Sequence, residues 1–278
     1  MKVIRTSVEM LALRKTLKGS VGLVATLGGI HKGHVAHFET LRPKVDFLVG
    51  SIFLNPTQFS RAEDIDSYPH NENDDLTVFK KNGVDIAFVP SVEEIYTKKD
   101  STTVDPGILG RISEGASREG HFIGVATVVT KLFILVSPDV ASFGQKDAQQ
   151  LQVIKNLIRD LGLKVEIITI PTIRDVDGLA FSTRNQYLNT AERTSASKIY
   201  KSLLLGDSYE KNGTIKSEKV IKSVKEYLTR DPLMEIDYLE IVDSVSFKPN
   251  KFLENGNILV LAVRIGKARL IDNIILST

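Results

Sequence analysis

The sequence contains no cysteine, and that absence removes a whole class of chemistry. Without thiols the chain forms no disulfide bonds and uses no cysteine as a nucleophile or metal ligand. A cysteine-free composition is compatible with the reducing cytoplasm, which is where we expect the protein to work.

Long apolar runs are missing as well. The most apolar window, residues 125–136, contains Lys131 and is much shorter than the roughly 20 residues that a membrane-spanning helix requires. The first residues, Met1 to Arg5, lack the apolar centre of a secretory signal peptide. We therefore expect neither export nor a membrane partner.

Neither sign of charge dominates the chain. Lysine and arginine together number 36 against 34 for aspartate and glutamate, which gives a net charge of +2. The lysines are spread along the sequence without a basic run, so we expect no nucleic-acid partner. The 278 residues, 42% hydrophobic and 25% charged, are typical of a globular protein with one large domain or two modest ones.

Short apolar segments that alternate with helical stretches predict the fold of the first part. The strand candidates are residues 21–26, 47–54, 85–89, 141–143 and 165–170. An amphipathic helix is expected over 151–161, ended by Gly162, and an earlier one is expected to be capped by Ser7 and to end near Lys18, with Gly19 just beyond. Strands separated by helices imply crossover connections, so the pattern predicts an α/β domain with a parallel sheet.

The pattern changes after residue 172. A helix that Thr190 can cap is expected to run through Leu205, and a second helix fits 217–228. Strand-like runs follow at 237–242, 258–265 and 270–275. The sequence therefore predicts a first domain at residues 1–172 and a small α+β domain at residues 173–278.

Three of the five histidines, His31, His34 and His37, lie close together after the pair Gly28–Gly29. They stand where the strand at 21–26 is expected to turn into a helix. Backbone N–H groups of such a turn can approach an anion, and two imidazoles there can donate hydrogen bonds to a phosphate. Two other interpretations stay open: histidines that only decorate a turn, and a zinc site, for which His31 and His34 have the spacing.

Two more polar segments follow predicted strands. The first contains Asn55 and Gln58, whose amides suit a polar organic substrate. The second spans 143–150, where Gly144 permits close backbone approach and Lys146 can reach a phosphate. Each segment alone also fits an ordinary turn or helix cap.

Three further segments are weaker candidates. Residues 181–185 place two hydroxyls beside Arg184, which suits polyphosphate oxygens, although a polar surface turn is the alternative. Residues 113–122 look too polar to pack into a core, so they predict a mobile lid or a surface insertion. Asp74 and Asp75 are weak candidates for a site near bound Mg²⁺, with a solvated helix start as the alternative.

In this order, the segments resemble a known family. A His-x-Gly-His sequence after a first strand resembles the nucleotidyltransferases and class I tRNA synthetases, and the whole set is similar to the pantothenate synthetases, the pantoate–β-alanine ligases. The matching stretches are 26–34, 51–59, 64–69, 90–96, 114–133, 143–154, 177–188 and 268–273. The chain departs from the family pattern at Ala25, Leu27, His70, Gln145 and Thr183, where proline, methionine, arginine, glutamate and serine are usual.

The resemblance implies a Rossmann-like N-terminal domain, a smaller C-terminal lid and a homodimer. It also implies a reaction in two steps, with ATP as a substrate and Mg²⁺ as a cofactor. ATP and (R)-pantoate give pantoyl adenylate and pyrophosphate, and β-alanine then attacks the adenylate to give pantothenate and AMP.

The resemblance further implies roles for single residues. His31, His34, Lys146 and Arg184 would be catalytic, with His34 in the position of the proton donor. Gln58, Gln150 and Asn55 would hold pantoate, and Gln58 would also contact β-alanine. The ATP-binding set would be Leu27, Gly28, Gly29, Ile30, His31, Lys32, Gly33, His34, Gly144, Gln145, Lys146, Asp147, Ile173, Phe181, Ser182, Thr183 and Arg184.

Two other functions stay open at this point. Another nucleotidyltransferase of the same superfamily, acting on a phosphorylated acceptor, would need more cationic residues facing that acceptor, and this sequence offers amides instead. A non-catalytic nucleotide-binding regulator would have lost at least one of His34, Lys146 and Arg184, and all three are present.

Overall fold

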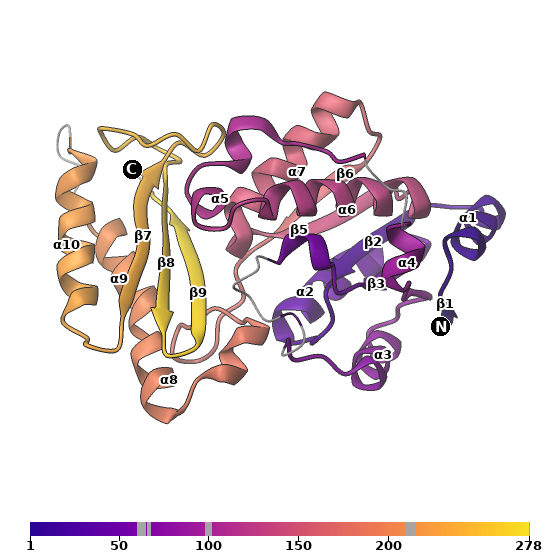
Figure 1. Ribbon diagram of the computed structural model, residues 1–278, viewed down its shortest axis with the longest axis horizontal. Helices are drawn as coiled ribbons and strands as arrows, with labels where there is room; N and C mark the ends of the chain where they lie inside the picture. The colour runs from indigo at the N-terminus through magenta and orange to yellow at the C-terminus, as the bar shows by residue number, and fades with distance from the viewer. Residues whose placement is uncertain (60–64, 66–67, 98–101, 210–214, 278) are drawn as a thin grey trace.

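Six parallel strands form the larger of two sheets in the computed structural model, which describes residues 1–59, 65, 68–97, 102–209 and 215–277 (Figure 1). The strand order is β1–β4–β3–β2–β5–β6. The strands are β1 (Lys2–Ile4), β2 (Val21–Thr26), β3 (Phe47–Ile52), β4 (Ile86–Phe88), β5 (Val140–Gly144) and β6 (Glu166–Ile170). This confirms the α/β class and the parallel sheet that the sequence predicts.

Helices cover both faces of this sheet. One face packs against α1 (Ser7–Thr16), α6 (His121–Val136) and α7 (Ala148–Leu161), and the other packs against α2 (Lys32–Leu41) and α3 (Glu72–Lys81). Alternate residues of β2 serve the two faces, since Leu23 belongs to the first core and Val24 to the second. Burial on both sides explains why β2 is apolar up to its last residue, Thr26.

The sequence misplaced the ends of the first helix. Thr6, not Ser7, is the N-cap: its hydroxyl accepts from the backbone N–H of Glu9, and the Glu9 carboxylate accepts in return from the N–H of Thr6. Helix α1 ends at Thr16, so Gly19 lies beyond its C-terminus and does not cap it. The amphipathic helix ends at Leu161 with Gly162 in the left-handed conformation, as expected.

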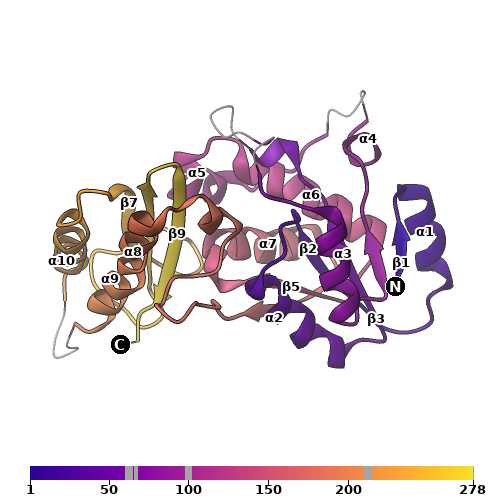
Figure 2. The same cartoon turned by 90° about the horizontal axis from the view of Figure 1, so that it is seen from below.

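The smaller sheet is antiparallel, in the order β7 (Glu235–Val242), β8 (Ile258–Ile265) and β9 (Ala268–Ile275). Leu259 and Leu261 of β8 belong to the core formed with α9 (Lys198–Asp207) and α10 (Ser217–Thr229), whereas Ile258 and Val260 pack into the core of the larger domain. The small sheet is therefore sandwiched between its own helices and the larger domain, as Figures 1 and 2 show.

The single helix expected from Thr190 to Leu205 is divided into two helices. Asn189 caps α8 (Thr190–Ala196) by a capping box with Glu192, and α9 starts at Lys198 after a break at Ser197. Thr190 is therefore the first helical residue and not the cap.

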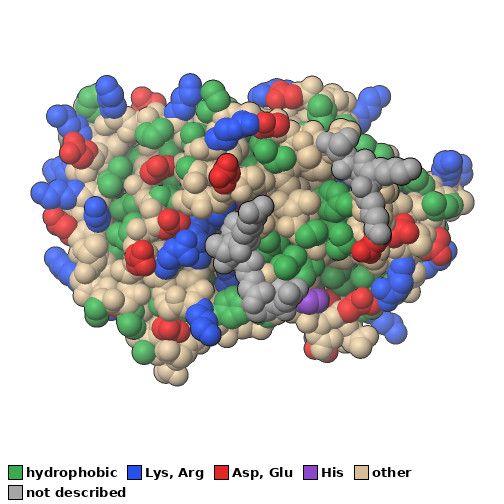
Figure 3. All heavy atoms as spheres, in the orientation of Figure 1, with side chains coloured by type: hydrophobic (Ala, Val, Ile, Leu, Met, Phe, Trp, Pro, Cys, Tyr) green, Lys and Arg blue, Asp and Glu red, His purple; other side chains and the backbone are tan. Residues whose placement is uncertain are grey.

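No helix in the described part of the chain is both long and apolar enough to span a membrane. On the face seen in Figure 3, basic and acidic side chains are interspersed and neither sign forms a large patch. Asp64, Asp66 and Ser67 of the matching stretch 64–69, and residues 98–101, lie outside the described residues.

Helix α6 makes an unusually close approach to the 3₁₀ turn η2 (Pro56–Gln58). A Cβ on Gly124 would lie 2.3 Å from the carbonyl oxygen of Thr57 and 2.7 Å from the backbone nitrogen of Gln58. Only a residue without a side chain permits this packing. Gly124 therefore helps to determine where Gln58 lies.

We predict that Gly124→Ala displaces the turn that carries Gln58. The added methyl meets backbone atoms that cannot rotate away, so overpacking should cost about 1–3 kcal/mol of stability, offset in part by better helix propensity. Urea unfolding measures the loss, and the NMR shift of the Gln58 side-chain amide reports the displacement. Gly206→Ala is the control, because its methyl would meet the side chains of Leu259 and Val224, away from the turn. An unmoved Gln58 amide in Gly124→Ala would contradict the prediction.

Candidate active site

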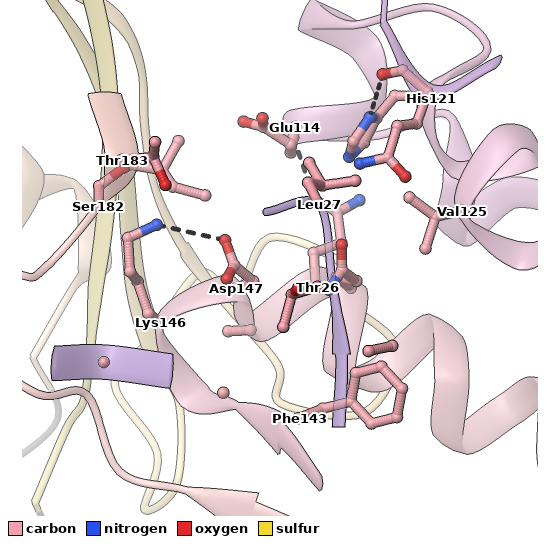
Figure 4. Close-up of a pocket in the computed structure, with 18 of the residues that line it drawn as sticks. Thr26, Leu27, Glu114, His121, Val125, Phe143, Lys146, Asp147, Ser182 and Thr183 are labelled. Atoms are coloured by element: carbon pink, nitrogen blue, oxygen red, sulfur yellow. Dashed lines mark hydrogen bonds and ion pairs between the residues drawn. The ribbon is translucent and has the colours of Figure 1, made fainter. Parts of the chain in front are cut away.

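A cavity opens where the strand order of the larger sheet reverses. Strand β2 lies between β3 and β5. After β2 the chain forms β3 and β4 on one side of it, and it later forms β5 and β6 on the other side. In open α/β sheets, the crevice at the carboxyl ends of such strands is where ligands bind. Residues of both domains line the cavity, among them Leu27, His31, His34, Gln58, Glu114, Lys146, Asp147, Gln150, Arg184, Arg269 and Asn273. Figure 4 shows part of this lining, with Leu27, Glu114, Lys146 and Asp147 labelled.

In the glycine turn before the histidines, three backbone N–H groups donate to side chains of the protein and do not face the cavity as free donors. The N–H of Gly29 and that of Ile30 donate to the two carboxylate oxygens of Asp75, at 2.9 and 2.7 Å. The N–H of Gly28 donates to the hydroxyl of Thr26, at 3.3 Å. These donors are satisfied within the protein, so the expected backbone trap for phosphate is wrong for this part of the turn.

Asp75 is thus an anchor of the turn. Its side chain is buried, and each of its carboxylate oxygens accepts a hydrogen bond from a backbone N–H group, whereas Asp74 beside it is exposed. Among the described residues, no group of three or more His, Asp or Glu side chains could hold a metal ion. Asp75 is therefore a structural residue of the turn, and the three histidines form no such group with one another or with a described carboxylate.

His31 and His34 stack at the start of α2, with ring centroids 4.0 Å apart. His31 Nδ1 accepts from the N–H of Gly33 at 3.1 Å, and His34 Nδ1 accepts from the N–H of His31 at 3.3 Å. A neutral ring that accepts at Nδ1 carries its proton on Nε2. Both rings line the cavity, and their Nε2–H groups are the donors that they can offer to a ligand.

The surroundings keep these rings uncharged. Burial, assisted by the charge of Lys146, lowers the pKa of His31 from 6.5 to about 4. Burial also lowers the pKa of His34 well below 6.5, and that of His37, whose Nδ1 pairs with the Ser142 hydroxyl at 2.9 Å, to about 4. His31 and His34 are therefore neutral at physiological pH, and each can act as a hydrogen-bond donor to an anion.

The positive charge at this end of the cavity comes from Lys146 and Arg184. Lys146 lies in the 3₁₀ turn η4 (Gln145–Asp147) that follows β5, with its Nζ 3.4 Å from a carboxylate oxygen of Asp147 (Figure 4). Phe181, Ser182, Thr183 and Arg184 approach from the segment after β6 and line the same cavity. Thr183 is also structural, since its hydroxyl donates to the carbonyl of Gly29 at 3.3 Å and so ties this segment to the glycine turn.

The other end of the cavity is made of amides and apolar side chains. Gln58 and Gln150 line it together with an apolar wall formed by Phe53, Phe122, Val125, Val128, Val129, Leu132 and Phe143. Asn55 is fully buried: its Nδ2 donates to Oε1 of Gln58 at 3.0 Å, and its Oδ1 accepts from the hydroxyls of Thr57 and Tyr96. Asn55 therefore orients Gln58, whose own amide N–H₂ remains for a ligand.

The expectation that residues 113–122 are too polar to pack is wrong. Glu114, Arg118 and His121 are buried, and Glu114 pairs with Arg269 of β9 through two contacts of 2.8 Å. Burial opposes ionisation of Glu114, but the hydrogen bonds and charge of Arg269, with Arg118, outweigh it and hold the pKa at about 2. The segment is polar because it fills an ionic junction between the domains, where α5 (Glu114–Ser117) lies in Figures 1 and 2.

Sequence reasoning missed several residues that build the site. Gln149 fastens the segment before α5 by donating to the carbonyls of Leu109 and Ile112, both at 2.8 Å. Asn273 of β9 donates to the carbonyls of Gln145 and Lys146, both at 2.9 Å. None of these contacts has a local sequence signal, because each joins segments that are far apart along the chain.

Known proteins are similar to this chain in both sequence and fold. Residues 2–275 match the family described as pantoate-beta-alanine ligase. Pantothenate synthetase from Thermosipho melanesiensis is 45% identical over 278 residues, covering 99% of this chain and 99% of its own. A pantothenate synthetase structure from Thermus thermophilus has a TM-score of 0.93 at 39% identity, with 100% of both chains covered. A pantoate-beta-alanine ligase from Francisella tularensis, complexed with beta-gamma ATP and beta-alanine, has a TM-score of 0.84 at 31% identity, covering 100% of this chain and 98% of that one.

The two neighbouring aspartates provide a matched test of the turn. Asp75→Asn replaces one carboxylate oxygen by an N–H₂ group that faces a backbone N–H, so we expect a loss of about 1–3 kcal/mol in stability and weaker ATP binding. Asp74→Asn should stay within about 0.5 kcal/mol of the wild type, because that side chain is exposed. Thermal unfolding and ATP titration measure both. If both variants lost the same stability and ATP affinity, Asp75 would not be the residue that anchors the turn.

The buried histidines should make the protein sensitive to mild acid. The unfolded chain takes up protons near pH 6.5, whereas folded His37 resists protonation until about pH 4, so stability should fall as pH drops through this interval. The loss should be about 3 kcal/mol for His37 alone. In His37→Asn the difference in unfolding free energy between pH 7 and pH 5 should be smaller than in the wild type. An unchanged difference in His37→Asn would show that this ring does not resist protonation.

Proposed function

Because this chain belongs to the pantoate-beta-alanine ligase family, we propose that its cavity joins (R)-pantoate to β-alanine, with ATP, through a pantoyl adenylate. One observation supports this best. A single cavity at the switch point combines an end rich in cations and imidazole donors with an end made of amides and apolar side chains. The first end suits a polyphosphate, and the second suits a small branched hydroxy acid.

The donors of the first end are suited to adenylate formation. The pantoate carboxylate attacks the α-phosphorus of ATP, a new P–O bond forms, and the bond to the β-phosphate breaks as pyrophosphate leaves. Negative charge accumulates on the transferring group and on pyrophosphate during this step. Lys146, Arg184 and the Nε2–H groups of His31 and His34 would stabilise it by hydrogen bonds that need little rearrangement.

The second end would select and orient pantoate. Gln58 and Gln150 can hydrogen-bond its hydroxyl and carboxylate groups without adding charge, and the wall of valines and phenylalanines would hold its dimethyl carbon. An amide pocket also favours a non-phosphorylated acceptor, which argues against a nucleotidyltransferase that acts on a phosphorylated acceptor. The presence of His34, Lys146 and Arg184 together argues against a regulator without activity.

In the second step, the amine of β-alanine attacks the acyl carbon of the adenylate, an amide bond forms, and AMP leaves. The adenylate reacts with water, so it needs a closed site. Both domains line the cavity, and β9 approaches it from the smaller one. We place the domain boundary at residues 172 and 173, between the end of β6 at Ile170 and the bridge that pairs Arg174 with Ala180.

Mg²⁺ would enter with ATP, since the described residues offer it no dedicated set of ligands. The homodimer and the cytoplasmic location remain predictions from the family resemblance and the composition.

The order of product release tests the proposed function. With ATP and pantoate alone, we expect pyrophosphate to appear while AMP stays bound as adenylate; adding β-alanine should then release AMP and pantothenate in equal amounts. Lys146→Ala should slow pyrophosphate release by on the order of a hundredfold, because it removes a donor that acts on the transition state. Lys155→Ala, on the exposed side of α7, is the control. Formation of ADP and phosphate would instead indicate an acyl phosphate and overturn the proposal.

A further inference from the structure

Strand β9 touches the larger domain at two separate points. Arg269, Ile271 and Asn273 alternate along the strand, so they share one face, and all three line the cavity. Arg269 and Asn273 are four positions apart along the strand, which corresponds to about 13 Å. One rigid strand therefore reaches both ends of the cavity at once.

The Asn273 contact lies at the cationic end. Its Nδ2 donates to the carbonyls of Gln145 and Lys146, both at 2.9 Å, and its Oδ1 accepts from Nε2 of Gln145 at 3.2 Å. Asp272 beside it is held by Arg174, at 2.5 and 2.9 Å. The bonds of Asn273 hold the backbone of Lys146, whose ammonium group would meet the polyphosphate in the proposed function.

The Arg269 contact leads to the amide end through a relay of buried side chains. Arg269 pairs with Glu114, and Glu114 pairs with Arg118 at 3.3 Å. Arg118 Nη1 lies 3.1 Å from Nε2 of His121, and His121 Nδ1 lies 2.8 Å from the backbone carbonyl oxygen of Gln58. Arg118 Nη2 also contacts this oxygen, at 3.2 Å. Since that carbonyl can only accept, His121 donates from Nδ1 and accepts from Arg118 at Nε2.

We propose that β9 positions the two half-sites separately: Asn273 sets Lys146 for ATP, and Arg269, through Glu114, Arg118 and His121, sets Gln58 for pantoate. These are positioning residues, because they act through Lys146 and Gln58. The inference rests on the proposed function, in which those two residues meet ATP and pantoate. It adds that seating one strand of the small domain completes both binding sites, so neither substrate is fully held until that strand is in place.

The test compares two mild variants by pyrophosphate release without β-alanine. Asn273→Ala should raise KM for ATP about tenfold and leave KM for pantoate within about twofold. Arg269→Lys keeps a positive charge beside Glu114 but loses the paired guanidinium contacts, so it should raise KM for pantoate about tenfold and spare ATP. Asp231→Asn is the stability control, because Asp231 pairs with Ser195 and Lys198 inside the small domain; it should lower Tm and change neither KM.

A double-mutant cycle tests the relay. Arg269 and His121 are connected only through other side chains in the described contacts, so Arg269→Lys and His121→Asn should be non-additive in kcat/KM for pantoate. Arg269→Lys and Asn273→Ala should be additive. Equal shifts for both substrates in every variant, in proportion to the loss of Tm, would overturn the proposal. A wild-type enzyme that makes no pantothenate would refute the proposed function instead, and the two failures are therefore distinct.

Discussion

The buried carboxylate of Glu114 is the constraint on which the arrangement of the two domains depends. It lies between two arginines from different parts of the chain and also accepts from the Tyr238 hydroxyl at 3.1 Å. A charge removed from water in this way is stable only while its partners stay in place. The ionic junction thus favours one relative placement of the domains more sharply than apolar packing alone, which tolerates small shifts.

A second principle applies to the site itself. Backbone N–H groups of the turn form hydrogen bonds within the protein, so side chains remain to contact a ligand. Asp75 and Thr26 take the N–H groups of the glycine turn, and the imidazole Nδ1 atoms take two more. These bonds order the turn without a ligand and leave the Nε2–H groups of His31 and His34 as hydrogen-bond donors. Such prior ordering reduces the rearrangement that would otherwise add to the reaction barrier.

The sequence predicted those features that have a local cause. Strand β2 was predicted at its full length because burial on both faces makes nearly every residue apolar. His31, His34 and Lys146 were predicted because they follow strand ends. Cap positions were misplaced by one residue, since Thr6 and Ser7, or Asn189 and Thr190, are chemically similar candidates side by side. The ionic junction was missed altogether: Glu114 and Arg269 are 155 residues apart, and no periodicity relates them. Glu114 therefore looked like part of a polar surface loop.

The packing of β8 into both cores has a consequence for temperature. If the small domain swings away to admit substrates, Ile258 and Val260 leave the core of the larger domain and become hydrated. Exposure of apolar area raises the heat capacity, so the free energy of opening follows a curve with a maximum and not a straight line in temperature. The fraction of open molecules should then have a minimum at some temperature and rise on either side of it. The rate of substrate entry would therefore depend on the hydration of two aliphatic side chains, Ile258 and Val260.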